Sequence, residues 1–282
     1  MTGATWTSSD GLSLCYRDHP GSPDRPPLLC LPGLTRNSRD FDDFATRYAG
    51  RFRIIAPDFR GRGNSDRDPV PAHYIPPTYA ADVLHLLDQL GVAEALFVGT
   101  SLGGIVTMLI AATQPRRIAG CILNDVGPEL EERGLERIRT YVGKPMRFHG
   151  WDEAADYVAE VNLGLPRSHD HDDWLRAAQR LCREDDGAIV FDYDTAIAEP
   201  FNRVRDPTQP AFDMWPLYRR LGQKPLLILR GENSDLLSAA TADAMLDAAP
   251  GAILVTIPGV GHPPDLTEPA ALAAIDAFLA RF

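Results

Sequence analysis

Six short and almost continuously apolar runs recur along the chain, and each is bordered by Gly, Pro or Asp. Runs of this kind suit parallel strands that are covered on both faces, whereas a strand with one face in water alternates apolar and polar residues. The six runs are Leu28-Leu31, Arg53-Ala56, Ala95-Val98, Cys121-Leu123, Leu226-Leu229 and Ile253-Ile257. They predict a central sheet that is mainly parallel and buried.

Helical patterns lie between these runs. We expect helices over residues 38–48, 78–91, 102–114, 238–249 and 267–282. In the second, apolar residues fall on one helical face, and Gly91 suits the position just beyond the last turn. Near the start, Trp6 to Ser8 and Leu12 to Tyr16 flank Asp10-Gly11, which is a hairpin signal. Strands that alternate with helices indicate an α/β fold, with helices flanking the sheet.

The alternation stops near Gly127-Pro128 and resumes near Lys224-Pro225. Between these points we find three helical patterns and no obvious strand. The helical patterns are Glu131-Tyr141, Asp152-Val161 and Asp172-Arg183. The sequence therefore predicts an α/β core formed by residues 1–128 and 216–282, interrupted by a helical insertion over residues 129–215.

Charge and composition exclude several kinds of partner. The net charge of -11 and the pI near 5.1 argue against nucleic-acid binding, which needs a basic surface. No apolar stretch approaches the roughly 20 residues that cross a bilayer, and Met1 to Asp10 lacks the apolar run of a signal peptide. Cys30 and Cys121 sit inside apolar runs, without disulfide-like or metal-like spacing. We expect a reduced, cytoplasmic protein without nucleic-acid or membrane partners, and its oligomeric state stays open.

The pentapeptide Gly99-Thr100-Ser101-Leu102-Gly103 lies between an apolar strand and a helical pattern. Strand, sharp glycine-rich turn and helix form the context that a nucleophile elbow requires. The turn makes the Ser101 hydroxyl protrude, and the glycines relieve crowding between close backbones. The helix start directs amide groups toward the place where an oxyanion forms. Ser101 is therefore the candidate nucleophile.

A serine hydroxyl needs a base, and the base needs an acid to orient it. His262 lies in a glycine-rich loop between the last strand and the closing helix, which suits a base. Asp235 lies in the loop after Leu226-Leu229, so we expect it to be the acid. Asp125, at the end of an earlier strand, is the alternative acid. The order Ser101, Asp235, His262 is the one expected for this type of site.

Backbone amides of Leu34 and Leu102 are the expected oxyanion donors, since Leu34 follows an early strand and Leu102 follows the serine. The glycines of segment 58–66 lack the spacing of a dinucleotide-binding loop, so we interpret that segment as a structural turn. The acidic and histidine-rich segment 168–173 fits a loop that leads into a helix better than a metal site. We therefore expect no metal and no cofactor.

Together these residues give the chain a resemblance to the α/β-hydrolase superfamily, particularly to its capped bacterial members. The resemblance covers almost the whole length. It is carried by residues 31–34, 58–65, 99–104 and 261–262. It implies an α/β-hydrolase fold in which the insertion forms a helical cap over the active site. One departure is Pro32-Gly33, where the family usually has His-Gly.

The resemblance implies hydrolysis of a small or medium carboxylic ester or lactone through an acyl-enzyme. Relatives that are epoxide hydrolases or dehalogenases carry Asp at the nucleophile position, so Ser101 argues against both activities. Relatives that cleave C–C bonds often have Trp after the catalytic histidine, and Pro263 stands there in this chain. The alternatives are a C–C bond hydrolase, lyase or cofactor-free oxygenase on the same fold, and a small-molecule receptor with vestigial hydrolysis.

Overall fold

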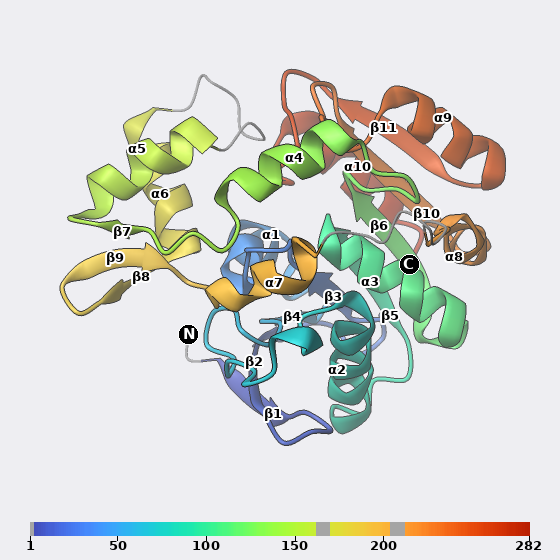
Figure 1. Ribbon diagram of the computed structural model, residues 1–282. Helices are drawn as coiled ribbons and strands as arrows, with labels where there is room; N and C mark the ends of the chain where they lie inside the picture. Colours follow the sequence, from blue (N-terminus) through green and yellow to red (C-terminus); the bar gives the residue numbers. More distant parts are fainter. Residues whose placement is uncertain (1–2, 162–169, 204–211) are drawn as a thin grey trace.

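The computed structural model describes residues 3–161, 170–203 and 212–282 (Figure 1). Its main sheet has eight strands in the order β1-β2-β4-β3-β5-β6-β10-β11. These strands are β1 (Ala4–Thr7), β2 (Ser13–His19), β3 (Leu28–Leu31), β4 (Ile54–Pro57), β5 (Ala95–Thr100), β6 (Ile118–Asn124), β10 (Leu226–Gly231) and β11 (Ile253–Ile257). The six strands β4, β3, β5, β6, β10 and β11 pair in parallel, and β2 pairs antiparallel with both β1 and β4. The mainly parallel sheet and its edge hairpin confirm the sequence prediction.

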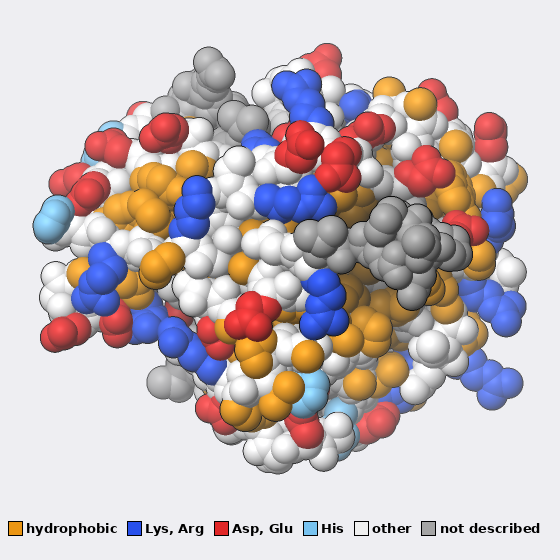
Figure 2. All heavy atoms as spheres, viewed as in Figure 1, with side chains coloured by type: hydrophobic (Ala, Val, Ile, Leu, Met, Phe, Trp, Pro, Cys, Tyr) orange, Lys and Arg blue, Asp and Glu red, His pale blue; other side chains and the backbone are white. Residues whose placement is uncertain are grey.

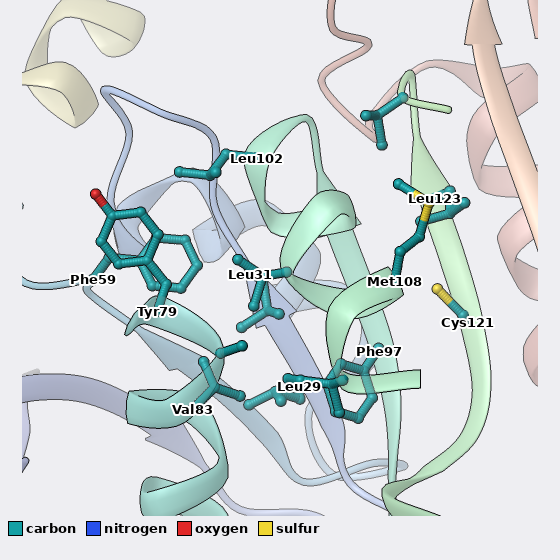
Figure 3. Packing of buried hydrophobic residues seen from close by; sticks show 14 of the residues in the cluster. Leu29, Leu31, Phe59, Tyr79, Val83, Phe97, Leu102, Met108, Cys121 and Leu123 are labelled. Carbon is teal, nitrogen blue, oxygen red and sulfur yellow. The ribbon is translucent and has the colours of Figure 1, made fainter. Parts of the chain in front are cut away.

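Helices cover both faces of the main sheet, which is why its inner strands are continuously apolar. One face carries α2 (Pro76–Gln89), α3 (Leu102–Thr113), α8 (Trp215–Leu221) and α9 (Ala239–Ala248). The other face carries α1 (Asp42–Tyr48) and α10 (Pro269–Leu279). Figure 3 shows Val83 of α2 beside Leu29 of β3, and Met108 of α3 beside Leu123 and Cys121 of β6. Cys30 and Cys121 are buried, as their apolar surroundings predict.

Several helix ends follow the local signals in the sequence. Asn37 caps the short 3-10 helix η1 (Ser38–Phe41), which leads into α1. Ser238 caps α9 by accepting a hydrogen bond from Thr241 N. Gly91 has a φ of +65° just beyond α2, a conformation that glycine adopts without steric cost. α2 begins at Pro76 rather than at Thr78, since proline is favoured in the first turn of a helix.

Between β6 and α8 the chain forms a separate set of elements, which we call the insertion. It contains α4 (Glu132–Tyr141), α5 (Trp151–Val161), α6 (His171–Leu181), the 3-10 helix η4 (Thr195–Ile197) and α7 (Ala198–Phe201). α5 and α6 pack against each other around a hydrophobic cluster of their own. In Figure 1, α4 runs between this pair and the end of the main sheet at β11.

The insertion also contains a small sheet that the sequence analysis did not predict. Strands β7 (Arg147–Phe148), β8 (Cys182–Asp185) and β9 (Ala188–Phe191) pair antiparallel in the order β7-β9-β8. The expectation of helices alone was therefore wrong. Asp186 and Gly187 join β8 to β9, and both have positive φ, as a tight hairpin turn requires.

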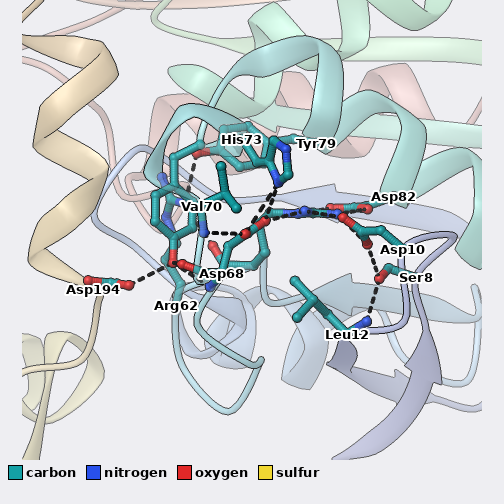
Figure 4. A network of polar contacts seen from close by, with 12 residues as sticks. Ser8, Asp10, Leu12, Arg62, Asp68, Val70, His73, Tyr79, Asp82 and Asp194 are labelled. Carbon is teal, nitrogen blue, oxygen red and sulfur yellow. Dashed lines mark hydrogen bonds and ion pairs between the residues drawn. The ribbon is translucent and has the colours of Figure 1, made fainter.

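The segment after β4 connects the core to the insertion. Asp58 accepts hydrogen bonds from Ser38 N and Asn64 N, so it fixes a turn, as predicted. Arg60 is buried among Asp10, Asp68 and Asp82, and Figure 4 shows these acids together. Close by, Gly61 O accepts a hydrogen bond from Asp194 N of the insertion at 2.7 Å. Among the described residues, no helix combines the length and apolar character that crossing a bilayer requires.

Candidate active site

Ser101 occupies the sharp turn between β5 and α3. Its φ of 51° and ψ of -115° place it in a region that L-residues avoid, at a cost of about 1–3 kcal/mol. The neighbouring glycines explain how the turn closes. A Cβ on Gly99 would lie 2.7 Å from Gly104 N, and a Cβ on Gly103 would lie 2.1 Å from Leu31 O. The elbow thus requires glycine on both sides of the serine.

His262 is buried, and its ring connects Ser101 to a carboxylate. Its Nε2 lies 3.1 Å from Ser101 Oγ, and its Nδ1 lies 2.8 Å from Asp125 Oδ2. An Nδ1–H that donates to Asp125 leaves Nε2 free to accept the hydroxyl proton of Ser101. Ser101, His262 and Asp125 thus form one continuous chain of hydrogen bonds, in the order that a nucleophile, a base and an orienting acid require.

Asp125 follows β6 and is fully buried, so its charge needs several partners. Gly231 N donates to its Oδ1 at 2.9 Å, and Ser234 Oγ donates to its Oδ2 at 2.7 Å. Nearby, Asn124 Nδ2 donates to Pro264 O at 2.8 Å, which ties the end of β6 to the loop that carries His262. These bonds fix the carboxylate and the histidine loop relative to each other.

Asp235 does not take the place that the sequence analysis assigned to it. Arg137 of α4 binds it through two hydrogen bonds, from Nε at 2.6 Å and from Nη2 at 2.9 Å. Burial alone would raise the pKa of Asp235, but the Arg137 bonds outweigh it and hold this pKa below its ordinary value. The prediction that Asp235 orients the histidine is therefore wrong, and the alternative residue, Asp125, contacts His262 instead.

The two expected oxyanion donors lie next to Ser101. Leu102 is the first residue of α3, where a backbone N–H has no acceptor within the helix. Leu34 borders the same cavity as Ser101 and Leu102. Its carbonyl accepts a hydrogen bond from Arg62 Nε at 2.9 Å, which anchors the loop. Arg62 itself is buried and also donates to Tyr79 Oη, as Figure 4 shows.

The cavity around Ser101 has two arms, and apolar side chains form most of the lining of both. The first arm contains His262 and brings the polar groups of Arg36, Arg137 and Tyr141 together among apolar residues. The second arm is lined by apolar and tyrosine side chains of α2, α3, α4 and α7 and their loops. Figure 2 shows hydrophobic side chains gathered in a hollow of this face, over α3 and α7. The insertion lines both arms, so it encloses the serine.

Some lining residues were not singled out by the sequence. Arg36 follows Leu34 by two residues and lines the first arm. Arg137 lies on α4 among charged residues, but only 18% of its side chain is exposed. Of the aromatic residues of the insertion, Tyr141, Phe191 and Tyr193 line the first arm of the cavity, and Phe201 lines the second. Others, such as Phe148, pack inside the insertion.

Within the described ranges, only Asp10, Asp68 and His73 bring metal-binding atoms close together. Arg60, which is buried, bonds both of these carboxylates, so the group is an ion-pair network around an arginine. In the segment 168–173, residues 168 and 169 lie outside the described residues. Asp170 caps α6 with a capping box, which confirms the predicted helix start.

Comparison with known proteins agrees with this architecture. The model of the alpha/beta hydrolase family matches residues 28–275. The chain belongs to this family. A crystal structure of an alpha/beta hydrolase from Novosphingobium aromaticivorans is 50% identical, with a TM-score of 0.93 over 100% of this chain and 98% of that one.

Two curated relatives are also similar over most of their length. The 3-hydroxybutyrate-oligomer hydrolase of Cupriavidus necator is 32% identical over 92% of this chain and 90% of the relative. The 2-(acetamidomethylene)succinate hydrolase of Mesorhizobium japonicum is 30% identical over 89% of this chain and 88% of the relative. Hydrolase activity is therefore supported for this member of the family.

Proposed function

We propose that this chain hydrolyses a small or medium carboxylic ester or lactone, with Ser101 as nucleophile, His262 as base and Asp125 as orienting acid. The observation that carries the proposal is the continuous chain of contacts, 3.1 Å from Ser101 Oγ to His262 Nε2 and 2.8 Å from His262 Nδ1 to Asp125. The geometry fits a serine made nucleophilic by proton transfer to a fixed imidazole.

In the proposed mechanism, Ser101 Oγ attacks the carbonyl carbon while its proton passes to His262 Nε2. The backbone amides of Leu34 and Leu102 donate to the oxyanion, whose charge also faces the positive end of α3. Collapse of the tetrahedral intermediate expels the alcohol, which takes the proton from Nε2. A water molecule then attacks the acyl-enzyme, with His262 as base, and releases the acid and Ser101.

We infer that the insertion acts as a cap that limits the size of the substrate, because its residues line both arms of the cavity. A long polymer would have to enter through an opening bordered by α4 and α7, whereas a short ester fits beneath them. One relative is named for an oligomer of 3-hydroxybutyrate and the other for 2-(acetamidomethylene)succinate, and both names support a derivative of an organic acid as substrate.

The test is reaction with a fluorophosphonate, which forms a covalent bond with an activated serine. Intact-mass and peptide analysis should place the label on Ser101, and 4-nitrophenyl butyrate should show a burst of nitrophenol. Ser101→Ala should lose the label and lower turnover by at least about 10³-fold. Wild-type-like turnover in Ser101→Ala would contradict the proposal and would instead favour a lyase or oxygenase that uses His262 as base.

A further inference from the structure

Two arginines border the first arm of the Ser101 cavity, and they come from different parts of the molecule. Arg36 follows the Leu34 loop of the core, and Arg137 lies on α4 of the insertion. About a fifth of each side chain is exposed, 20% for Arg36 and 18% for Arg137. Both guanidinium groups interact electrostatically with Tyr141, which also lines this arm, so the two positive charges converge beside the serine.

Each arginine is held in place by one aspartate. Arg36 Nε donates to Asp40 Oδ2 at 2.6 Å, and Arg137 donates through Nε and Nη2 to Asp235. A guanidinium has five N–H donors, so these bonds use only part of its capacity. Among the described residues, Arg36 Nη1 and Nη2 have no hydrogen-bond partner that we identify. The two aspartates therefore hold the arginine side chains in place, while other N–H donors of each guanidinium remain available to a ligand in the cavity.

The charge balance of this arm favours a singly charged anion. Asp40 and Asp235 offset much of the charge of Arg36 and Arg137, and Asp265 also interacts electrostatically with Arg36. A doubly charged phosphate would therefore meet repulsion from three nearby carboxylates. A carboxylate carries one charge and has the planar shape that matches a guanidinium. The second arm is apolar and begins at the same serine, so it suits an uncharged acyl or alkyl portion.

We propose that Arg36 and Arg137 bind a carboxylate carried by the substrate, so that the preferred substrates are esters with an anionic end and an apolar end. This proposal rests on the proposed function, because it concerns the cavity of the same nucleophile. Arg36 and Arg137 are specificity-determining residues in this view. They act on substrate binding and leave the chemistry to Ser101 and His262.

Two pairs of substrates test the proposal, each a free acid and its methyl ester. In the mono(4-nitrophenyl) ester of adipic acid the carboxylate is on the acyl side, and in 3-(butanoyloxy)butanoic acid it is on the alcohol side. The wild-type enzyme should favour the acid in at least one pair, by roughly 10- to 100-fold in kcat/KM, as expected for a charged hydrogen-bonded contact. Arg36→Gln and Arg137→Gln should remove this preference by raising KM for the acid, with kcat little changed.

Arg133→Gln is the matched control, because Arg133 is an exposed arginine on the same helix as Arg137. It should leave both pairs unchanged. Since Arg137→Gln deprives Asp235 of its ion pair, Arg137→Lys is a second variant, which should regain part of the preference if charge matters. The methyl esters report folding and chemistry, so their kinetic constants should stay near wild type in Arg133→Gln. For the Arg36 and Arg137 variants, the ratio of kcat/KM between each acid and its methyl ester is the quantity compared.

The outcomes separate the two proposals. Equal kcat/KM for acid and methyl ester in both pairs would overturn the carboxylate subsite. So would a preference for the acid that survives Arg36→Gln and Arg137→Gln. In either case, turnover that still depends on Ser101 would leave the hydrolase proposal standing. Loss of activity on all four substrates in wild type, without fluorophosphonate labelling, would instead refute the proposed function itself.

Discussion

Replacing Asp125 by Asn gives the sharpest test of the site, because the structure dictates how the new side chain must sit. Gly231 N donates to Oδ1 of Asp125, so that position has to remain an oxygen. The amide nitrogen of Asn would then occupy the Oδ2 position, 2.8 Å from His262 Nδ1. An NH2 group there is a donor, so Nδ1 would have to accept, and the ring proton would move to Nε2.

The altered tautomer places an N–H opposite Ser101 Oγ, where the mechanism needs a free lone pair. In Ser-His-Asp enzymes this error lowers kcat by roughly 10⁴-fold, which corresponds to about 5.5 kcal/mol of activation free energy. We expect a fall of that size in Asp125→Asn. KM should change little, because Asp125 is fully buried and does not line the cavity.

The assay is steady-state hydrolysis of 4-nitrophenyl butyrate at pH 8, with circular dichroism and thermal unfolding to verify the fold. The matched control is Asp235→Asn, in the neighbouring loop. Asp235 contacts Arg137 rather than His262, so we expect kcat for this neutral ester to stay within about tenfold of wild type. The reasoning is refuted if Asp125→Asn retains more than a tenth of wild-type kcat, or if Asp235→Asn loses as much.

Two further predictions concern stability. Gly103→Ala would place a Cβ 2.1 Å from Leu31 O, so we expect the free energy of unfolding to fall by more than about 3 kcal/mol. Gly251→Ala is the control, because a Cβ at Gly251 would contact no atom beyond its own chain neighbours, and it should lower the free energy of unfolding by less than about 1 kcal/mol. Equal urea midpoints for these two variants would contradict this explanation of the elbow. Burial raises the pKa of Asp265 from 3.8 to about 6, with Arg180 offsetting part of the effect, so this carboxyl should lower the free energy of unfolding progressively as pH rises from about 4 to about 6. Asp265→Asn should abolish that dependence and should be more stable than wild type at pH 7, by at most about 3 kcal/mol. The measurement is urea unfolding of both proteins at pH 4.5 and 7. A variant that is less stable than wild type at pH 7 would contradict the prediction.

The core of the fold could be predicted because its signals are local. A run such as Leu28–Leu31 is buried on both faces, and its continuous apolar character is enough to predict this burial. The turn at Ser101 was predictable for the same reason, since the glycines and the flanking elements lie within a few residues of it. Such features depend on the backbone and on immediate neighbours, and the rest of the chain does not change them.

The small sheet of the insertion could not be recognised in this way. β8 has the sequence Cys-Arg-Glu-Asp, which is polar and shows no strand pattern. It is a strand because β9 pairs with it and because Cys182 packs in the hydrophobic cluster of α5 and α6. The Asp186-Gly187 turn was the available signal, and it became meaningful only with partners on both sides.

The identity of the acid depends on contacts that cross the whole molecule. Asp125 follows β6 and Asp235 lies beyond β10, and these strands are neighbours in the sheet, with Asn124 opposite Leu229. Both carboxylates therefore approach the same edge, and chain order alone does not choose between them. Arg137 of α4 distinguishes the two carboxylates, because it binds Asp235 in an ion pair while Asp125 contacts Nδ1 of His262.

This arrangement gives the insertion an electrostatic role in addition to a steric one. Asp235 is close enough to His262 for their charges to interact, so an unpaired carboxylate there would compete with Asp125 for the imidazolium. Pairing with Arg137 removes that competition and at the same time positions a guanidinium at the wall of the cavity. A single ion pair thus separates the two acids and, under the proposed carboxylate subsite, supplies charge for substrate binding. Changes at Arg137 should consequently affect both the pH dependence of catalysis and the preference for anionic esters, whereas changes at an exposed position of α5 such as Asp156 should affect neither.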